Sequence, residues 1–248
     1  MKGMIFAAGL GTRLAPLTDT CPKALIEVGG HPMLERVIRH LIRAGVSDIV
    51  MNVHHHAEMV KEYIASHDFG VPIHISDESD RLLDTGGGVV KAAPLLENAD
   101  DIILYNADIF TDVVLSEMVE YHRRNRNNAT LLTSTTRNSS RRLLFDPLSG
   151  LLKGWRNMHT GEIRSPFSRE VTDNCRPEAF GGIHIINRLT LERLKEWGTD
   201  DKFSITPFYT DICDRLCISS FHPSADYTWI DIGRPETLEQ ARAIASDK

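Results

Sequence analysis

In the first half of the chain, short continuous apolar runs alternate with longer segments in which apolar residues recur every three or four positions. The run at 4–8 is apolar throughout and ends against a glycine, which is typical of a strand covered on both faces. Between 32 and 44, apolar residues recur every three or four positions, behind a proline and ahead of Gly45. That spacing predicts an amphipathic helix with a proline start and a glycine stop.

The same alternation continues to residue 125. In chain order the pattern predicts a strand at 49–53, a helix at 57–66, a strand at 72–76, a helix beginning near Gly86, a strand over 101–108 and a helix at 114–125. Strands that alternate with helices form a mostly parallel sheet covered on both faces. We therefore expect an α/β protein with a three-layer, Rossmann-like fold and a mixed sheet that is mostly parallel.

The pattern changes after a strand at 129–136. Residues 137–176 are rich in Arg, Asn, Ser, Gly and Pro and hold only short strand-like pieces, which indicates a lid-like insertion over a site. A strand at 178–187, two helical stretches, a strand at 217–221 and a helical C-terminal segment restore the α/β character. Because no internal repeat or linker interrupts the chain, we expect residues 1–248 to form a single domain.

Composition narrows the function only slightly. With 42% hydrophobic and 25% charged residues the chain has the profile of an ordinary globular protein, and its net charge of -6 argues against a nucleic-acid partner. No apolar run approaches the ~20 residues of a membrane span, and the N-terminus lacks a signal-peptide pattern. We therefore expect a cytoplasmic protein with no membrane partner, either a monomer or a small homo-oligomer.

Cysteine and histidine give no strong metal signal. The four cysteines contain no C-x-x-C pair and are interpreted as free thiols. The run His54-His55-His56 is a weak candidate for metal binding, because three consecutive side chains cannot all face one ion. A structural role at a strand end is the stronger interpretation.

A glycine-rich loop follows the first strand, "AAGLGTRLAPLTDTCPKAL" at 7–25. A dinucleotide fingerprint would need a third glycine where Leu14 stands, and the P-loop string is absent. What remains is a set of backbone donors with two cations, Arg13 and Lys23, on a segment kept extended by prolines. This combination suits a triphosphate.

Two aspartates stand at strand ends and are candidate metal ligands. Asp108 closes the apolar run at 101–108, and Asp231 lies in "YTWIDIG". Mg²⁺ is commonly held by one or two carboxylates together with phosphate oxygens. Each aspartate taken alone also suits a helix cap or a turn. Asp112 is better interpreted as the cap of the helix that follows it.

Two further segments have a functional and a structural interpretation. The run "DTGGG" at 84–88 leaves room for a flat base against the backbone, or it is a helix start capped by Asp84 or Thr85; both can hold together. A basic cluster in the lid-like region meets a phosphate or forms a solvated face. Its members are Arg137, Arg141, Arg142, Lys153 and Arg156.

The motifs together resemble the sugar-phosphate nucleotidyltransferase family. The family signature G-x-G-T-R-[LM]-x-P-L-T…P-K-x-[LM] is matched without departure in the opening loop. Its two metal motifs correspond to Asn106-Ala107-Asp108 and to Trp229-Ile230-Asp231-Ile232-Gly233. The resemblance extends over nearly the whole chain.

This resemblance implies that a sugar 1-phosphate and an NTP are joined to give an NDP-sugar and pyrophosphate, with Mg²⁺ as cofactor. Asp108 and Asp231 would hold the metal, Lys23 would neutralise charge near the α-phosphate, and Arg13 would hold the leaving pyrophosphate. The implied nucleotide contacts are Ala8, Gly9, Gly11, Thr12, Arg13, Asp84, Thr85, Gly86 and Gly87. The implied sugar-phosphate contacts are Arg142, Lys153, Glu178 and Gly182.

Within the family the chain looks most similar to compact bacterial enzymes. The patterns "LLDTGGG" and "NADIFTD" favour a uridylyltransferase acting on N-acetylmuramate 1-phosphate over a guanylyltransferase acting on mannose or heptose 1-phosphate. Two other classes stay open. One is a non-catalytic nucleotide-sugar-binding regulatory protein, and the other is a nicotinamide-dependent oxidoreductase, which Leu14 opposes.

Overall fold

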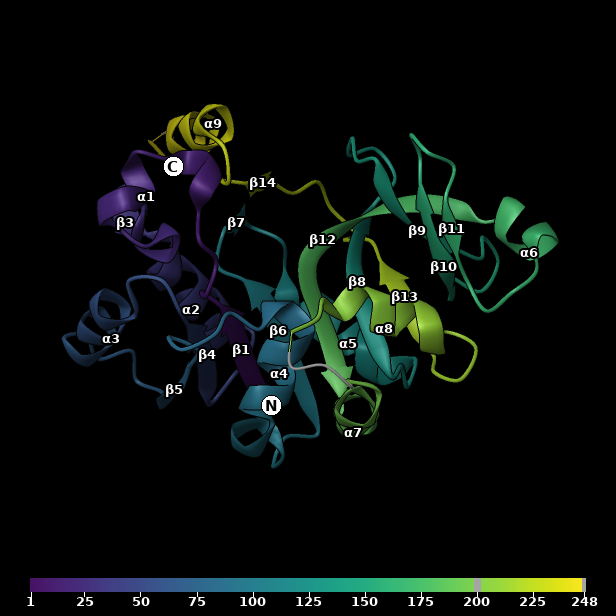
Figure 1. Cartoon of the computed structure of the whole chain (residues 1–248), viewed down its shortest axis with the longest axis horizontal. Coiled ribbons are helices and arrows are strands. Elements are labelled where there is room, and N and C mark those ends of the chain that lie inside the picture. The colour runs from purple at the N-terminus through teal and green to yellow at the C-terminus, as the bar shows by residue number, and fades with distance from the viewer. Residues whose placement is uncertain (199–201, 247–248) are drawn as a thin grey trace.

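A single sheet extends through both halves of the molecule in the computed structural model, which describes residues 1–198 and 202–246 (Figure 1). From one edge to the other its strands are β5 (Ile73–Asp77), β4 (Ile49–Val53), β1 (Lys2–Phe6), β6 (Asp101–Asn106), β12 (Arg176–Asn187), β9 (Arg141–Phe145), β10 (Leu152–Asn157) and β11 (Ile163–Arg164). Strand β12 also pairs with β8 (Ala129–Ser134), which in turn pairs with β13 (Ile218–Phe221).

The sheet is parallel in one half and antiparallel in the other. Strands β5, β4, β1 and β6 are parallel, whereas β12 is antiparallel to β6, β8 and β9. The α/β class and the mixed sheet are thus confirmed, with the parallel pairs among β1, β4, β5 and β6 and between β8 and β13. Residues 137–176, expected as a lid-like insertion, supply β9, β10 and β11 and the short helix α6 (Arg169–Asp173). These strands follow one another antiparallel, which short turns can connect without a crossover helix.

Strand β12 joins the two halves and bends between them (Figure 1). Its C-terminal part pairs with β6, its first residues pair with β9, and its register with β8 shifts between Phe180 and His184. Gly182 sits in this shift with φ +71°, in the left-handed region that glycine adopts without steric cost. The bend therefore depends on a glycine at this position.

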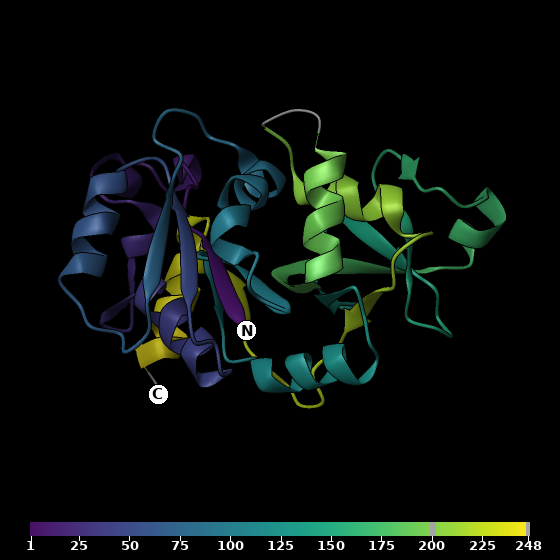
Figure 2. The same ribbon diagram turned by 90° about the horizontal axis from the view of Figure 1, so that it is seen from below.

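Helices cover both faces of the sheet and create two cores. On one face lie α2 (Met33–Arg43), α3 (Ala57–Ala65) and α5 (Leu115–Arg124), and on the other lie α4 (Asp84–Leu96), α7 (Arg188–Trp197) and α8 (Ile205–Ile212). Figure 2 shows α5 and α7 on opposite sides of the sheet. The helix expected at 32–44 is confirmed as α2, where Leu34, Ile38 and Leu41 are fully buried. Burying each of them contributes about 2 kcal/mol.

A third, smaller core brings the C-terminal segment to the opening loop. Helix α9 (Pro235–Ser246) buries Leu238 and Ala241 against Leu14, and Figure 1 shows it beside the opening loop. The same core includes Ile230 of β14 (Trp229–Asp231), which pairs with β7 (Ile109–Thr111). The opening loop itself contains three short helices, η1 (Thr12–Leu14), α1 (Leu17–Thr20) and η2 (Lys23–Leu25), and the hairpin β2 (Glu27–Val28) and β3 (His31–Pro32) follows it. The opening loop and the C-terminal helix, more than 200 residues apart in the sequence, are thereby packed together.

Two further expectations concern the thiols and the membrane. All four cysteines are free in the described structure, as expected. Among residues 1–198 and 202–246, no helix combines the length and the apolar character that crossing a bilayer requires.

Asp101 at the start of β6 provides a test of the fold. A hydrogen bond to buried His122 and another to Arg123 lower the pKa of Asp101 to about 2. Because this pKa is lower in the folded state than in the unfolded state, ionised Asp101 stabilises the fold above pH 4, and the contribution fades as the pH falls toward 2. Asp101→Asn should therefore lower the free energy of unfolding by about 2 kcal/mol at pH 6 and by about half of that at pH 3.

Denaturant unfolding of both proteins at the two pH values measures this difference. Asp19→Asn is the matched control, since Asp19 is exposed and makes no ion pair within the described structure. An Asp101→Asn penalty that is the same at pH 6 and pH 3 would contradict the assignment.

Candidate functional site

A cavity opens where the parallel strands end. Strands β1, β4 and β6 are parallel, so their carboxyl ends meet at one edge of the sheet, where open α/β sheets hold ligands. The cavity has a volume of about 170 Å³, and we call it the inner cavity. Its lining comprises Phe6, Ala7, Ala8, Gly9, Lys23, Ala24, Asn52, Leu82, Asp84, Thr85, Asn106, Ala107 and Asp108. The opening loop, the segment after β6 and the start of α4 therefore meet at one place.

The opening loop is tightly folded around Gly11. Its φ is +66°, and a Cβ there would lie 2.7 Å from the Thr18 side chain, so only glycine fits. The Thr18 hydroxyl donates a hydrogen bond to the Gly11 carbonyl at 3.0 Å. At the start of the loop, the backbone N–H of Ala7 donates to the Asn52 side chain at 2.9 Å. The loop is therefore held at both ends of its glycine-rich part.

One lysine lies between two carboxylates. The Lys23 ammonium contacts Asp108 and lies 3.6 Å from the Asp231 carboxylate, and its side chain is only 11% exposed. Asp231 reaches this position because β14 pairs with β7, directly after Asp108. Two backbone bonds fix the arrangement: Ile232 N–H donates to Asp108 O at 3.0 Å, and Gly233 N–H donates to the Asp231 carboxylate at 2.8 Å. The structure thus brings together three of the four predicted catalytic residues.

Gly233 brings the fourth predicted residue, Arg13, to the same point. A Cβ at Gly233 would lie 2.8 Å from Asp231, 2.8 Å from the Lys23 ammonium and 2.9 Å from the Arg13 guanidinium. Because three charged groups approach this backbone so closely, no larger residue fits without moving them. Two cations and two carboxylates therefore form one cluster beside the inner cavity.

The donor set of this cluster fits a divalent cation. Asp108 Oδ1 is buried and accepts no hydrogen bond from the residues that the structure describes, and an unmatched buried acceptor of this kind is costly unless a ligand satisfies it. Asp108 and Asp231 together would supply the one or two carboxylates that Mg²⁺ usually takes from a protein, with phosphate oxygens and water completing its shell. No group of three or more His, Cys, Asp or Glu side chains arranged for a metal occurs in the described residues, so the protein alone builds no full cage.

The second glycine cluster packs against Phe203. The N–H groups of Gly86 and Gly87 both donate to Phe203 O, at 2.8 and 3.2 Å, and a Cβ at Gly86 would overlap the Phe203 ring. Both N–H groups are therefore engaged by Phe203, just before α8, and contact of Gly86 and Gly87 with a base stays a prediction. Asp84 and Thr85 are the members of the cluster that line the inner cavity. Neither caps α4, whose N-cap is Leu83.

A buried polar pair connects two loops of the inner cavity, and it was missed from the sequence. The Asn52 amide, which accepts from Ala7, donates to Glu78 at 2.8 Å, and Glu78 accepts from Leu83 N–H at 3.1 Å. Burial raises the pKa of Glu78. The chain Ala7–Asn52–Glu78–Leu83 sets the spacing between the opening loop and the segment before α4. The only sequence signal was a polar residue inside the otherwise apolar strand at 49–53.

A larger cavity of about 500 Å³ lies between β9–β11 and α8, and we call it the outer cavity. It is lined by Ser139, Arg141, Leu143, Trp155, Asn157, Glu162, Arg164, Phe180, Ser204, Thr206, Pro207 and Thr210. It lies close to the inner cavity, because Ile205, between the lining residues Ser204 and Thr206, donates its N–H to the hydroxyl of Thr85 in the inner cavity at 3.0 Å. The buried ring of His184 packs between Phe6 and Phe180, 6.3 and 5.2 Å from their ring centroids. Burial lowers the pKa of His184 to about 3, so the ring is neutral near pH 7.

None of the four predicted sugar-phosphate contacts lines either cavity. Arg142 donates to the carbonyls of Thr135, Arg137, Ser139 and Pro177, and therefore ties the turn before β9 to β12. The Lys153 ammonium lies over the Phe167 ring, 4.4 Å from its centroid. A phosphate contact of Arg142 or Lys153 stays a prediction, whereas the strand pairing places Arg141 and Trp155 at the outer cavity.

Glu178 is enclosed, contrary to its predicted role as a sugar contact. It is fully buried and accepts hydrogen bonds from Arg176 at 2.6 Å, Thr133 at 2.5 Å and His222 at 2.7 Å. Burial alone would raise the pKa of Glu178, but these three bonds outweigh it and lower the pKa.

Gly182, in contrast, lies beside the residues before Asp108, because a Cβ there would be 2.9 Å from the Asn106 amide.

Two smaller expectations are also resolved. Asp112 does not cap α5; its carboxylate accepts from Thr228 N–H at 2.7 Å, which fixes the segment that leads into β14. The interpretation of Asp112 as a cap was wrong because its partner is 116 residues away. His54 Nδ1 lies 2.6 Å from Glu78 O, which agrees with a structural role for the first residue of the histidine run.

Comparison with known proteins identifies the family. Residues 2–142 match the family model "Nucleotidyl transferase", so the chain belongs to that family. It is 35% identical over 241 residues to a mannose-1-phosphate guanyltransferase of Debaryomyces hansenii, covering 95% of this chain and 62% of the relative. It is 29% identical to an N-acetylmuramate alpha-1-phosphate uridylyltransferase of Caulobacter vibrioides, covering 97% of this chain and 95% of the relative.

Solved structures agree on the fold. A candidate glucose-1-phosphate thymidylyltransferase of Bacillus anthracis superposes with a TM-score of 0.83 at 21% identity, covering all of this chain and 96% of the other. HddC from Yersinia pseudotuberculosis gives 0.71 at 19% identity, with 98% of each chain covered. Nearly all of this chain aligns with the fungal guanyltransferases, but it spans only about three fifths of their length.

Substitution of Gly233 tests the charged cluster. In Gly233→Ala the added methyl group would displace Asp231 and the two cations, so we expect Mn²⁺ to bind at least about tenfold more weakly, since losing one ligand interaction costs more than 1.4 kcal/mol. Electron paramagnetic resonance titration of free Mn²⁺ measures the affinity. The melting temperature should change by only a few degrees. Unchanged Mn²⁺ affinity would show that the metal does not bind at this cluster.

Proposed function

We propose that the protein joins a sugar 1-phosphate and a nucleoside triphosphate to form an NDP-sugar and pyrophosphate. The observation that carries this proposal is the convergence of Arg13, Lys23, Asp108 and Asp231 at the edge of the inner cavity. Residues 1–248 act here as one nucleotidyltransferase domain in the cytoplasm, with the strands of 137–176 on the sugar side.

The geometry suits an in-line displacement at the α-phosphorus. An oxygen of the sugar phosphate attacks, a new P–O bond forms, and the bond between the α-phosphorus and the bridging oxygen to the β-phosphate breaks. No general base is needed, because a phosphate monoester is already ionised near neutral pH. Positioning and charge stabilisation therefore carry the reduction of the barrier.

Each charged residue has a separate task in this reaction. Lys23, buried between the two carboxylates, stabilises the charge that develops around the α-phosphate, and Arg13 binds the departing pyrophosphate. Bound at Asp108 and Asp231, Mg²⁺ supplies charge neutralisation at the phosphate oxygens. The Ala8 and Gly9 backbone faces the inner cavity, where it meets the nucleotide together with Asp84 and Thr85.

For the substrate pair we favour UTP with N-acetylmuramate 1-phosphate. The uridylyltransferase of Caulobacter vibrioides supports this choice, because alignment covers 95% of its length, whereas the fungal guanyltransferases extend well beyond the aligned region. GTP with mannose or heptose 1-phosphate is the second candidate, supported by the higher identity of 33 to 35% to the guanyltransferases.

Pyrophosphate release tests the proposal directly. Four NTPs are combined with N-acetylmuramate, N-acetylglucosamine, mannose, heptose and glucose 1-phosphates in the presence of Mg²⁺. We expect turnover to be fastest with UTP and N-acetylmuramate 1-phosphate. If the folded protein binds nucleotide but no pair releases pyrophosphate, it is a non-catalytic binding protein and the proposal is wrong.

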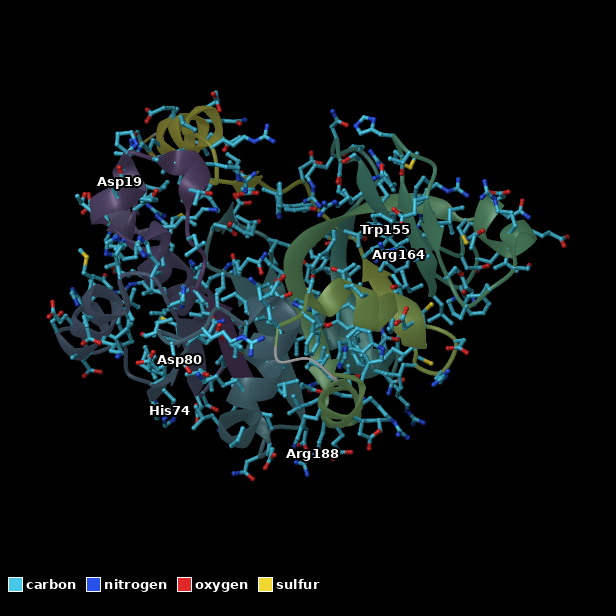
Figure 3. The ribbon with its side chains drawn as sticks, in the orientation of Figure 1. Asp19, His74, Asp80, Trp155, Arg164 and Arg188 are labelled. Carbon is cyan, nitrogen blue, oxygen red and sulfur yellow. The ribbon has the colours of Figure 1, made fainter. Side chains whose placement is uncertain are left out.

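Neutralising either carboxylate should abolish turnover without unfolding the protein. Asp108→Asn and Asp231→Asn each remove a metal ligand but leave Lys23 one carboxylate partner, so we expect kcat to fall by about 10³-fold or more with a small change in melting temperature. Asp19→Asn, an exposed aspartate of α1, is the control and should retain full activity (Figure 3). Wild-type turnover in either site variant would place the metal elsewhere.

A further inference from the structure

The outer cavity has the composition of a carbohydrate site. Trp155 and Phe180 offer apolar ring faces, and Ser204 and Thr206 place hydroxyl groups at the N-terminus of α8. Apolar walls with a few convergent polar groups are typical of pockets for small ligands. Because the start of α8 borders both cavities, with Ile205 N–H bonded to Thr85, a sugar bound here would extend its phosphate toward the inner cavity and Asp108.

Almost every basic side chain of this region is already engaged. Arg137 donates to the carbonyls of Ala179 and Phe180, Arg142 to four carbonyls, Arg156 to Asp173 and Arg164 to Glu162, while Lys153 lies over the Phe167 ring. Arg141 is different. Its guanidinium has no acceptor among the residues that the structure describes, and its side chain is exposed at the cavity wall.

Strand pairing fixes the side of the sheet on which Arg141 lies. It stands opposite Asn157 in the β9–β10 register, and Trp155 stands opposite Leu143. All four residues line the outer cavity. Figure 3 shows Trp155 and Arg164 next to each other at this end of the molecule. The lining holds two arginines, Arg141 and Arg164, and one carboxylate, Glu162, so its net charge is positive.

The Arg141 guanidinium in the outer cavity is not needed to bind the reacting phosphates. Lys23 and Arg13 already stand at the inner cavity, where the α-phosphorus would be attacked. The Arg141 guanidinium is therefore suited to a second anionic group of the substrate. Its fork of donors can make two parallel hydrogen bonds to a carboxylate.

We propose that Arg141 is a specificity-determining residue that binds a carboxylate substituent on the sugar. This inference rests on the proposed function and narrows its substrate class to acidic sugar 1-phosphates. N-acetylmuramate 1-phosphate carries such a group, the lactyl ether, and N-acetylglucosamine 1-phosphate differs from it by lacking this ether. The two compounds therefore isolate the interaction.

Steady-state kinetics with these two sugar phosphates and UTP test the proposal in wild type and in Arg141→Gln. For N-acetylmuramate 1-phosphate, kcat/KM should fall by about 10- to 100-fold in the variant, mainly through KM, as expected for the loss of a charge-assisted hydrogen bond. For N-acetylglucosamine 1-phosphate, kcat/KM should change less than about threefold. Arg141→Lys, which keeps the charge but loses the fork, should give an intermediate loss for the acidic sugar alone.

Matched variants separate position from charge. Arg188→Gln removes an exposed arginine at the lower edge of the molecule, away from Trp155 and Arg164, and should alter the kinetics with neither substrate (Figure 3). Arg164→Gln removes an arginine already paired with Glu162 and should have a smaller effect than Arg141→Gln. Equal losses for both sugars in Arg141→Gln would mean that Arg141 contacts the 1-phosphate, and no loss for either would mean that it contacts neither. Both results overturn the proposal.

Calorimetric titration with the two sugar phosphates, without nucleotide, keeps the test independent of turnover. Preferential binding of the acidic sugar that disappears in Arg141→Gln supports the inference even if pyrophosphate release fails. Equal binding of both sugars by the wild type overturns it even if pyrophosphate is released. Failure of the proposed function and failure of this inference are thus observed in different measurements.

Discussion

The contact of Lys23 with Asp108 and Asp231 is the interaction on which the site depends. It joins the opening loop, the end of β6 and the strand β14, which approach one another only because α9 packs on the loop and β14 pairs with β7. Each of these elements would be a loose surface segment alone. Partly burying Lys23 with the two carboxylates costs desolvation energy, so the backbone must hold the charged groups in place. The hydrogen bonds from Ile232 N–H to Asp108 and from Gly233 N–H to Asp231 do so.

Local patterns predicted much of the parallel half of the fold. The strand at 49–53 and the helix at 32–44 were placed nearly to the residue, because burial on both faces and the 3.6-residue period leave clear traces in a sequence. The four charged residues that we propose for the reaction centre were likewise recognisable from motifs. What the sequence could not show was their mutual geometry, since Asp231 approaches Lys23, more than 200 residues away in the sequence, only through the pairing of β14 with β7.

The sugar side was predicted less well, for reasons that are also physical. Arg141 and Arg142 are neighbours of the same type, yet successive residues of a strand point to opposite faces, so only the register of β9 with β10 distinguishes a cavity residue from a structural one. The glycines after Thr85 showed that space was needed but not which group needed it, and that group proved to be Phe203. Glu178 lies buried among partners from three separate segments.

A crystal structure with Mn²⁺ and a nucleoside triphosphate, with the metal located by its anomalous scattering, tests the central claim most directly. Carboxylate oxygens of both Asp108 and Asp231 should coordinate the ion at roughly 2 to 2.5 Å, as expected for hard divalent cations. Lys23 and Arg13 should contact the phosphate chain. An ion that is coordinated by neither aspartate, or phosphates that lie outside the inner cavity, would contradict the account.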